Sequence, residues 1–134
     1  MAQAAFEELV EDFEFLDDWE DRYRLVIEEG KAMPPLDAAL KVPATKVDGC
    51  ASQVWLHVTP KDGIMQFEGE SYAMIVNGLI AVLRRLYNGV SLEDVKKIDA
   101  RAEMARLGLN DHLSAQRSNG LRAMIERLQA TAAG

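Results

Sequence analysis

The sequence predicts an α+β fold in which a small antiparallel sheet packs against several helices. Apolar residues recur at helical spacing before residue 30 and again after residue 70. The region between them carries the β-rich run VWLHV at residues 54–58, followed by the turn sequence TPKDG at residues 59–63. We expect about three strands within one domain spanning residues 1–134.

Length and composition fit a single globular domain. The chain has 134 residues, of which 49% are hydrophobic and 28% are charged. No apolar run approaches the about 20 residues of a membrane span, and the first residues, MAQAAFEELVEDF, do not resemble a signal peptide. We therefore expect a cytoplasmic protein.

The net charge of −7 is unevenly distributed along the chain. Residues 7–29 contain eleven acids and two arginines, whereas residues 84–127 contain nine basic residues and six acids. The acidic end would repel phosphate backbones, which argues against nucleic acid as a ligand. Either these charges solvate helix faces or they steer a protein partner, and the sequence leaves both interpretations open.

Two helices are predicted before residue 33. The apolar stripe of the first is Phe6, Leu9, Val10 and Phe13. The stripe of the second is Trp19, Tyr23, Val26 and Ile27. We expect Asp17 to cap the second helix and Gly30 to mark its end. Pro34 and Pro35 prevent its continuation, so residues 36–45 should form an irregular connector or one helical turn.

The sheet is predicted to begin after this connector. Residues 52–58 should form one strand and residues 64–68 its antiparallel partner. A third strand is expected from around Lys46, and with two strands alone the sheet would need helices to cover it.

A central core helix is predicted after Gly69, with Ser71 as its cap and Gly89 at its end. Its stripe is Met74, Ile75, Leu79, Val82, Leu83 and Leu86. Gly78 within it is tolerable if another backbone packs close there.

Three further helices are expected in the last third of the chain. Ser91 and Asp94 indicate a capping box for a short helix over residues 92–98, and another helix should run to residue 107 before Gly108. The last helix should begin near Ser114, with the stripe Arg117, Leu121, Met124, Ile125 and Leu128.

Cys50 is the candidate reactive residue. It follows Gly49, which tolerates unusual backbone angles, and it precedes a β-rich run that could serve as a rigid base. A free cysteine is more often a small buried hydrophobe, and a strand beginning as early as Asp48 would turn Cys50 toward the core. Spacing alone leaves both possibilities open. One cysteine cannot form an internal disulfide, and together with two histidines it is too little for a structural zinc site.

Three blocks of sequence resemble the SufE family of sulfur acceptors in iron–sulfur cluster assembly. The first is GCASQVWL at residues 49–56, and the second is GES at residues 69–71 followed by IVNGLIA at residues 75–81. The third is HL at residues 112–113 followed by QRSNGL at residues 116–121. The blocks occur in the family's order and cover nearly the whole chain. The resemblance implies a SufE/IscU-like fold and a SufE- or CsdE-like protein.

The resemblance also implies a sulfur carrier and desulfurase activator rather than a self-sufficient enzyme. A PLP-dependent cysteine desulfurase, SufS- or CsdA-like, would present a persulfide, and the Cys50 thiolate would attack its outer sulfur. The sulfur would then pass to a SufBCD-like scaffold complex for cluster assembly. The carrier itself is expected to need no cofactor or metal and to bind neither nucleic acid nor membrane.

Supporting roles follow from the same resemblance. Gly49, Ser52, Gln53 and Arg117 are expected to support the cysteine site or contact the desulfurase, and the family carries an arginine at the position of Arg117. From the residues alone, Arg117 is equally a surface cation at the end of an apolar stripe. Lys46 and Arg117 are the cations that we expect to favour the thiolate.

One residue departs from the family's pattern. Tyr72 stands where family members generally have aspartate, so any role of a carboxylate at this position is in doubt. The sequence offers no physical reason for the tyrosine.

Two other classes of function would use Cys50 differently. A hydrolase nucleophile would need His57 or His112 as its base. Seven residues of extended chain would carry His57 about 20 Å away, which leaves His112 as the better candidate. A redox sensor would pass through a sulfenic acid, but the chain has no resolving cysteine.

Overall fold

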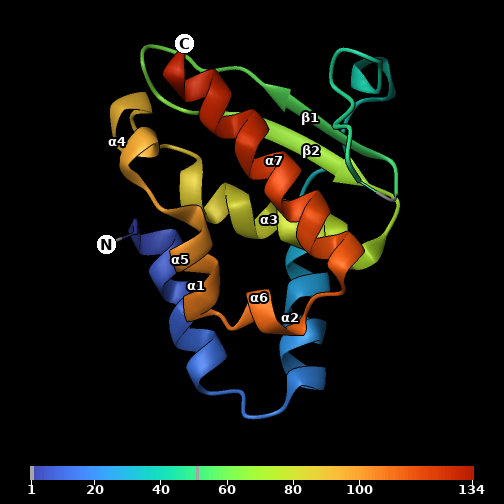
Figure 1. Ribbon diagram of the computed structural model, residues 1–134, viewed down its shortest axis with the longest axis vertical. Helices are drawn as coiled ribbons and strands as arrows, with labels where there is room; N and C mark the ends of the chain where they lie inside the picture. Colours follow the sequence, from blue (N-terminus) through green and yellow to red (C-terminus); the bar gives the residue numbers. More distant parts are fainter. Residues whose placement is uncertain (1, 51) are drawn as a thin grey trace.

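The computed structural model describes residues 2–50 and 52–134 and confirms the α+β fold class. The elements in chain order are α1 (Ala4–Glu14), α2 (Trp19–Ala32), the 3-10 turn η1 (Ala38–Leu40), β1 (Val54–Val58), β2 (Phe67–Ser71), α3 (Met74–Tyr87), α4 (Leu92–Lys97), α5 (Ala100–Arg106), α6 (Leu109–His112) and α7 (Ala115–Ala133). Figure 1 shows α7 crossing over the β1–β2 hairpin and α3.

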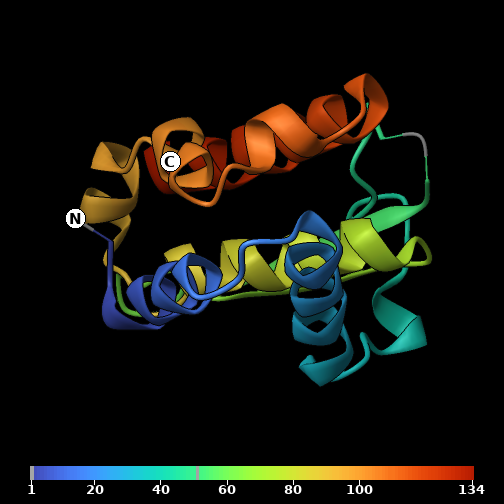
Figure 2. The same ribbon diagram turned by 90° about the horizontal axis from the view of Figure 1, so that it is seen from below.

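The elements form two layers with the core between them. Seen from below, α4 to α7 lie on one side, and α1 to α3 with the hairpin lie on the other (Figure 2). Each layer contributes fully buried side chains, such as Phe6 and Leu83 from one and Met104 from the other. Burying a side chain of this size contributes about 2 kcal/mol to stability. None of the helices that the structure describes is both long and apolar enough to cross a lipid bilayer.

The sheet consists of the antiparallel pair β1 and β2, with Val54 opposite Ser71 and Val58 opposite Phe67. The strand expected near Lys46 is reduced to a single bridge with Trp55. Helices therefore cover this small sheet, with α3 and α7 both in contact with it.

The second strand lies three residues later than predicted. Residues 64–68 were expected to form it, but Met65 is hydrogen-bonded to the loop after α3. The Met65 N–H donates to the Val90 carbonyl at 2.8 Å, and the Met65 carbonyl accepts from the Gly89 N–H at 3.0 Å. Because these backbone groups are occupied, pairing with β1 begins only at Phe67.

Some helix ends also differ from the predictions. The cap of α2 is Asp18 rather than Asp17, since its Oδ1 accepts from the Glu20 N–H at 3.0 Å. Ser71 belongs to β2 and does not cap α3, which starts at Met74 without a side-chain cap. Met74 is 62% exposed and therefore lies outside the core stripe.

The predicted caps of α4 and α7 are confirmed. The Ser91 hydroxyl accepts from the Asp94 N–H at 3.1 Å, and the Ser114 hydroxyl accepts from the Arg117 N–H at 3.3 Å. These caps are local side-chain-to-backbone contacts, which a sequence pattern can specify.

Two glycines let α2 and α3 cross with their backbones in contact. A Cβ on Gly78 would overlap the Val26 carbonyl group and lie 2.7 Å from its carbon, and a Cβ on Gly30 would lie 2.8 Å from the Gly78 nitrogen. The Asn77 Nδ2 also donates to the Gly30 carbonyl at 3.2 Å across this crossing. The close approach expected at Gly78 is confirmed. Gly30 serves the same contact inside α2, so it does not end that helix as predicted.

We expect Gly78→Ala to destabilise the fold by about 3 kcal/mol, because the new methyl would overlap backbone that cannot move alone. Denaturant unfolding would measure the loss. Gly63→Ala is a matched control, since its backbone is left-handed but nothing lies within 4 Å, and it should cost about 1 kcal/mol. A change within about 0.5 kcal/mol for Gly78→Ala would contradict the packing described.

Candidate functional site

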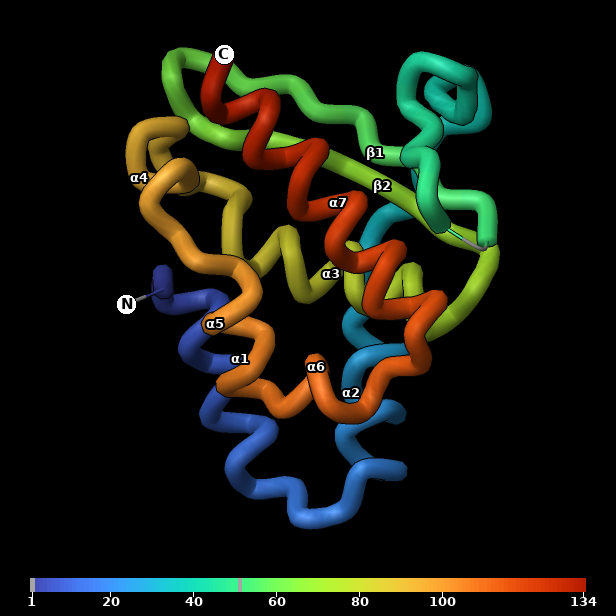
Figure 3. Tube along the Cα trace, viewed as in Figure 1, coloured from blue at the N-terminus to red at the C-terminus, as the bar shows by residue number. Residues whose placement is uncertain are grey.

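The cysteine loop, defined here as residues 46–50, lies at the end of the hairpin opposite the β1–β2 turn (Figure 3). Its base is fixed to β1 by backbone hydrogen bonds, from Val47 N–H to the Val54 carbonyl at 2.9 Å and from Leu56 N–H to the Thr45 carbonyl at 2.8 Å. Val47 is 3% exposed and anchors the loop in the core. The loop therefore has the rigid base that the sequence suggested.

Cys50 rests against the N-terminal half of α7. Its Sγ lies 3.8 Å from the Gly120 carbonyl oxygen, and a Cβ on Gly120 would lie 3.4 Å from Sγ. Gly49 has a φ of +90°, and a Cβ there would lie 3.5 Å from Cβ of Ala123. The turn at Gly49 thus carries the chain closely over α7 and sets the thiol beside Gly120.

Arg127 extends the same contact one turn further along α7. Its guanidinium donates to the Lys46 carbonyl at 3.1 Å and to the Ala44 carbonyl at 2.5 Å. Gly120, Ala123 and Arg127 follow one another at spacings of three and four residues, which places them on one face of the helix. This face of α7 therefore holds both the tip and the base of the cysteine loop.

The thiol faces a partly open hollow of about 380 Å³, the cysteine hollow. Its lining comes from the tip of the cysteine loop, the residue before Gln53, the start of α3 and the start of α7: Cys50, Ser52, Ala73, Val76, Ser114, Gln116, Arg117 and Gly120. Cys50 itself is half-buried. The strand begins only at Val54, so the alternation of side-chain direction along a strand does not extend back to Cys50 and does not turn the thiol into the core.

Burial raises the pKa of the Cys50 thiol, and the nearby carboxylate of Asp48 raises it further. In the free protein the thiol's surroundings and Asp48 set the direction of this shift, and Lys46 and Arg117 are not among its causes. Both side chains belong to exposed residues, where solvent screens their charges. The resting thiol is consequently held in its protonated form at neutral pH.

The structure brings most of the predicted site residues together. Ser52 lines the hollow and its Oγ lies 3.3 Å from the Oγ of Ser71, which links the first sequence block to the second. Arg117 lines the same hollow from α7. Gln53 is exposed and does not belong to the lining, and Ala51 of the first block lies outside the described residues.

Sequence reasoning did not single out Gly120. A glycine inside a helical pattern by itself only weakens the prediction of a helix. Its role depends on contact with a loop 70 residues away in the chain.

Neither histidine is placed to act as a base for Cys50. The ring of His112 stacks on Trp19 with centroids 3.7 Å apart, and its backbone carbonyl accepts from the Tyr23 hydroxyl. His57 lies within β1 opposite Glu68. Among the described residues that line the cysteine hollow there is no imidazole.

Tyr72 has a physical role that the sequence did not reveal. Its ring meets Trp55 edge-on at 5.1 Å, and the Lys41 ammonium lies 5.2 Å from the Tyr72 centroid and 5.5 Å from that of Trp55. Lys41 is also paired with Glu70 at 2.7 Å. A neutral ring can pack on this cation without competing with Glu70 for it, as an aspartate would.

Comparison with known proteins identifies the class to which this fold and cysteine site belong. Residues 7–132 match the family model described as SufE, Fe-S metabolism associated domain. The solution structure of a hypothetical protein from Thermus thermophilus has the same fold, with a TM-score of 0.80 at 23% identity over 99% of this chain and 96% of that one.

Two curated relatives are similar over nearly their whole length. An uncharacterized SufE-like protein of Rhizobium etli is 48% identical over 133 residues, covering 96% of this chain and 90% of the relative. A second, from Rhizobium meliloti, is 46% identical over 134 residues, covering 97% and 96%. The chain belongs to the SufE family, and this membership assigns it to sulfur transfer in iron–sulfur metabolism.

Proposed function

We propose that this protein is a cytoplasmic sulfur carrier whose Cys50 accepts persulfide sulfur from a PLP-dependent cysteine desulfurase, SufS- or CsdA-like. The observation that carries this proposal is the position of the chain's only thiol, which a fixed loop presents at a partly open hollow on α7. Family membership supplies the metabolic setting.

The transfer is a thiol exchange at sulfur. The Cys50 thiolate attacks the outer sulfur of the donor persulfide, so a new S–S bond forms at Cys50 Sγ and the donor cysteine leaves as a thiolate. Because burial raises the pKa of Cys50, this attack requires the thiol to lose its proton as the donor binds. In the proposal the donor's own groups supply that change, and the free carrier stays unreactive.

The remaining predicted residues take supporting roles in this proposal. Gly49 provides the left-handed turn that sets the loop on α7, and Ser52, between the loop and β1, forms a hydrogen bond with Ser71 of β2. Arg117, at the rim of the cysteine hollow, and the exposed Gln53 are suited to contact the desulfurase. An arginine at this rim could pair with a partner carboxylate or with the thiolate as it forms.

Removing sulfur from the donor cysteine would also stimulate the desulfurase, because its active cysteine becomes free for another turnover. The carried sulfur would then pass to a SufBCD-like scaffold complex by a second exchange of the same kind. The carrier needs only one thiol for both steps.

Intact-mass measurement after incubation with an active cysteine desulfurase and free cysteine tests the proposal. The wild-type protein should gain one sulfur atom that a reductant removes, and Cys50→Ser should gain none, since a hydroxyl of far higher pKa cannot replace the thiolate. Thermal melts should show that the serine variant stays folded. Absence of the adduct on the wild-type protein would rule out the carrier role, and unchanged desulfurase stimulation by Cys50→Ser would leave only an allosteric activator.

Arg117→Ala should lower the rate of sulfur acceptance while changing stability by no more than about 0.5 kcal/mol, because the side chain is exposed. The cap of α7 should persist, since Ser114 bonds the Arg117 backbone and not its side chain. Arg117→Lys should rescue poorly because it keeps the charge and loses the planar fork.

A sulfur-transfer assay paired with a thermal melt would measure both effects. Arg24→Ala is the matched control, an exposed arginine on α2 whose side chain pairs only with Asp21 among the described residues. Wild-type transfer by both Arg117 variants would remove this residue from the site.

A further inference from the structure

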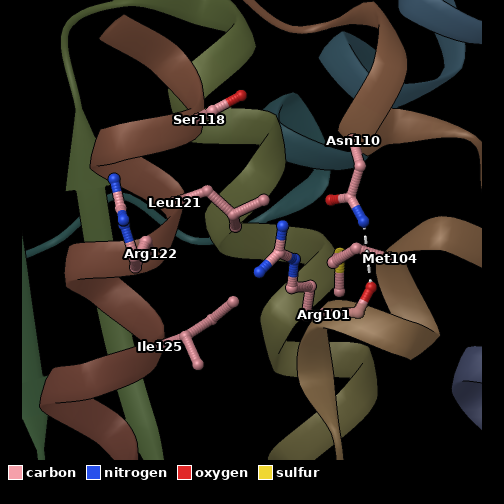
Figure 4. Close-up of a pocket in the computed structure, with 7 residues that line it drawn as sticks. All are labelled: Arg101, Met104, Asn110, Ser118, Leu121, Arg122 and Ile125. Atoms are coloured by element: carbon pink, nitrogen blue, oxygen red, sulfur yellow. Dashed lines mark hydrogen bonds between the residues drawn. The ribbon is translucent and has the colours of Figure 1, made fainter. Parts of the chain in front are cut away.

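A second hollow lies between α5, α6 and α7, outside the cysteine site (Figure 4). It has a volume of about 290 Å³, and we refer to it as the α5–α7 hollow. Its lining residues are Arg101, Met104, Asn110, Ser118, Leu121, Arg122 and Ile125. None of them was singled out by the sequence as part of a site.

The walls of this hollow combine an apolar floor with cationic groups. Met104 is 0% exposed and Leu121 is 5% exposed, so both belong to the core beneath the hollow. Figure 4 shows the Arg101 guanidinium extending into the space between these two side chains. The Asn110 Nδ2 donates to the Arg101 carbonyl at 3.0 Å, which fixes α6 to the backbone that carries this arginine.

Two other arginines in the second half of the chain are held in ion pairs. Arg85 is paired with Glu29, and Arg106 is paired with Glu7 at 2.6 Å and with Glu103 at 2.8 Å. Within the described part of the chain, no carboxylate forms an ion pair with Arg101 or Arg122.

Arg122 instead receives a neutral partner, the Asn119 side-chain oxygen. Arg101 and Arg122 are both exposed, and neither has an acidic partner among the described residues, so both guanidinium groups are available to an incoming carboxylate. Arginine pairs with carboxylates in a planar, bidentate geometry, so a carboxylate is the group that these walls fit best.

The α5–α7 hollow adjoins the cysteine hollow along α7. Arg117 and Gly120 face the cysteine hollow, whereas Ser118 and Leu121 face the α5–α7 hollow. Consecutive residues of an α-helix point a little less than a third of a turn apart, so the two hollows lie on neighbouring sides of the same turns of α7. A protein that reaches Cys50 over α7 would therefore also come close to the α5–α7 hollow.

We propose that the α5–α7 hollow docks an acidic side chain and a neighbouring apolar side chain of the sulfur-donating desulfurase. The carboxylate would pair with Arg101 and Arg122, and the apolar group would cover Leu121 and Ile125. The volume lies at the lower limit for small-molecule sites and suits one or two side chains. This inference rests on the proposed sulfur transfer and names a second contact for the same partner.

The test measures the desulfurase concentration that gives the half-maximal initial rate of sulfur transfer to Cys50. The double variant Arg101→Ala with Arg122→Ala should raise this concentration about tenfold, while the rate at saturating desulfurase stays near the wild-type value. The control is Arg24→Ala with Lys61→Ala, which removes two exposed positive charges away from both hollows. This control should change the concentration less than about twofold.

A thermal melt should show that the double alanine variant is folded. If it is not, Arg101→Lys with Arg122→Lys carries the test, because lysines keep the charge and lose the bidentate fork, and an increase of about threefold is expected. If the folded double variant has the same half-maximal desulfurase concentration as the wild-type protein, or if the control pair raises this concentration equally, the docking site is ruled out. The proposed sulfur transfer would not be affected by that result. Failure of the wild-type protein to gain sulfur would instead overturn the proposed function.

Discussion

The packing of the cysteine loop on α7 is the contact on which the functional site depends. α7 is itself fixed by Leu121, Met124 and Leu128, which enter the core on the side facing α3. Its other face carries Gly120, Ala123 and Arg127, which receive the loop. The position of Cys50 is therefore set by a helix at the far end of the chain, where a Cβ at residue 120 would lie in van der Waals contact with the thiol, 3.4 Å from its sulfur.

This packing gives the thiol two properties that suit a carrier. Burial raises its pKa and leaves it protonated when the protein is alone, which limits reaction with small oxidants and electrophiles. The cysteine hollow nevertheless leaves one side of the thiol open toward a partner. With the adjoining α5–α7 hollow, the same stretch of α7 offers a partner both the reacting atom and a cationic contact.

Local patterns in the sequence predicted much of the fold, and long-range contacts account for what they missed. The caps at Ser91 and Ser114 depend on residues three positions away, and these predictions are confirmed. The register of β2 depends on backbone bonds between Met65 and the loop after α3, which no local pattern records. The resemblance of the three sequence blocks named Cys50, Ser52 and Arg117 as site residues, and the structure places them around one hollow. The raised pKa of the thiol and the role of Gly120 follow only from the packing of the loop on α7.

The pH dependence of Cys50 alkylation by iodoacetamide measures whether α7 buries the thiol. The alkylation rate follows the thiolate fraction, so the pH at which the rate is half-maximal reports the pKa of the thiol. This midpoint pH should be higher in the folded protein than in an unstructured peptide spanning residues 46–58. The peptide keeps Asp48 but lacks the burial against α7. Asp48→Asn in the folded protein should lower the midpoint without bringing it to the peptide value, because burial is the larger cause. A midpoint in the wild-type protein at or below that of the peptide would contradict the burial of the thiol on α7.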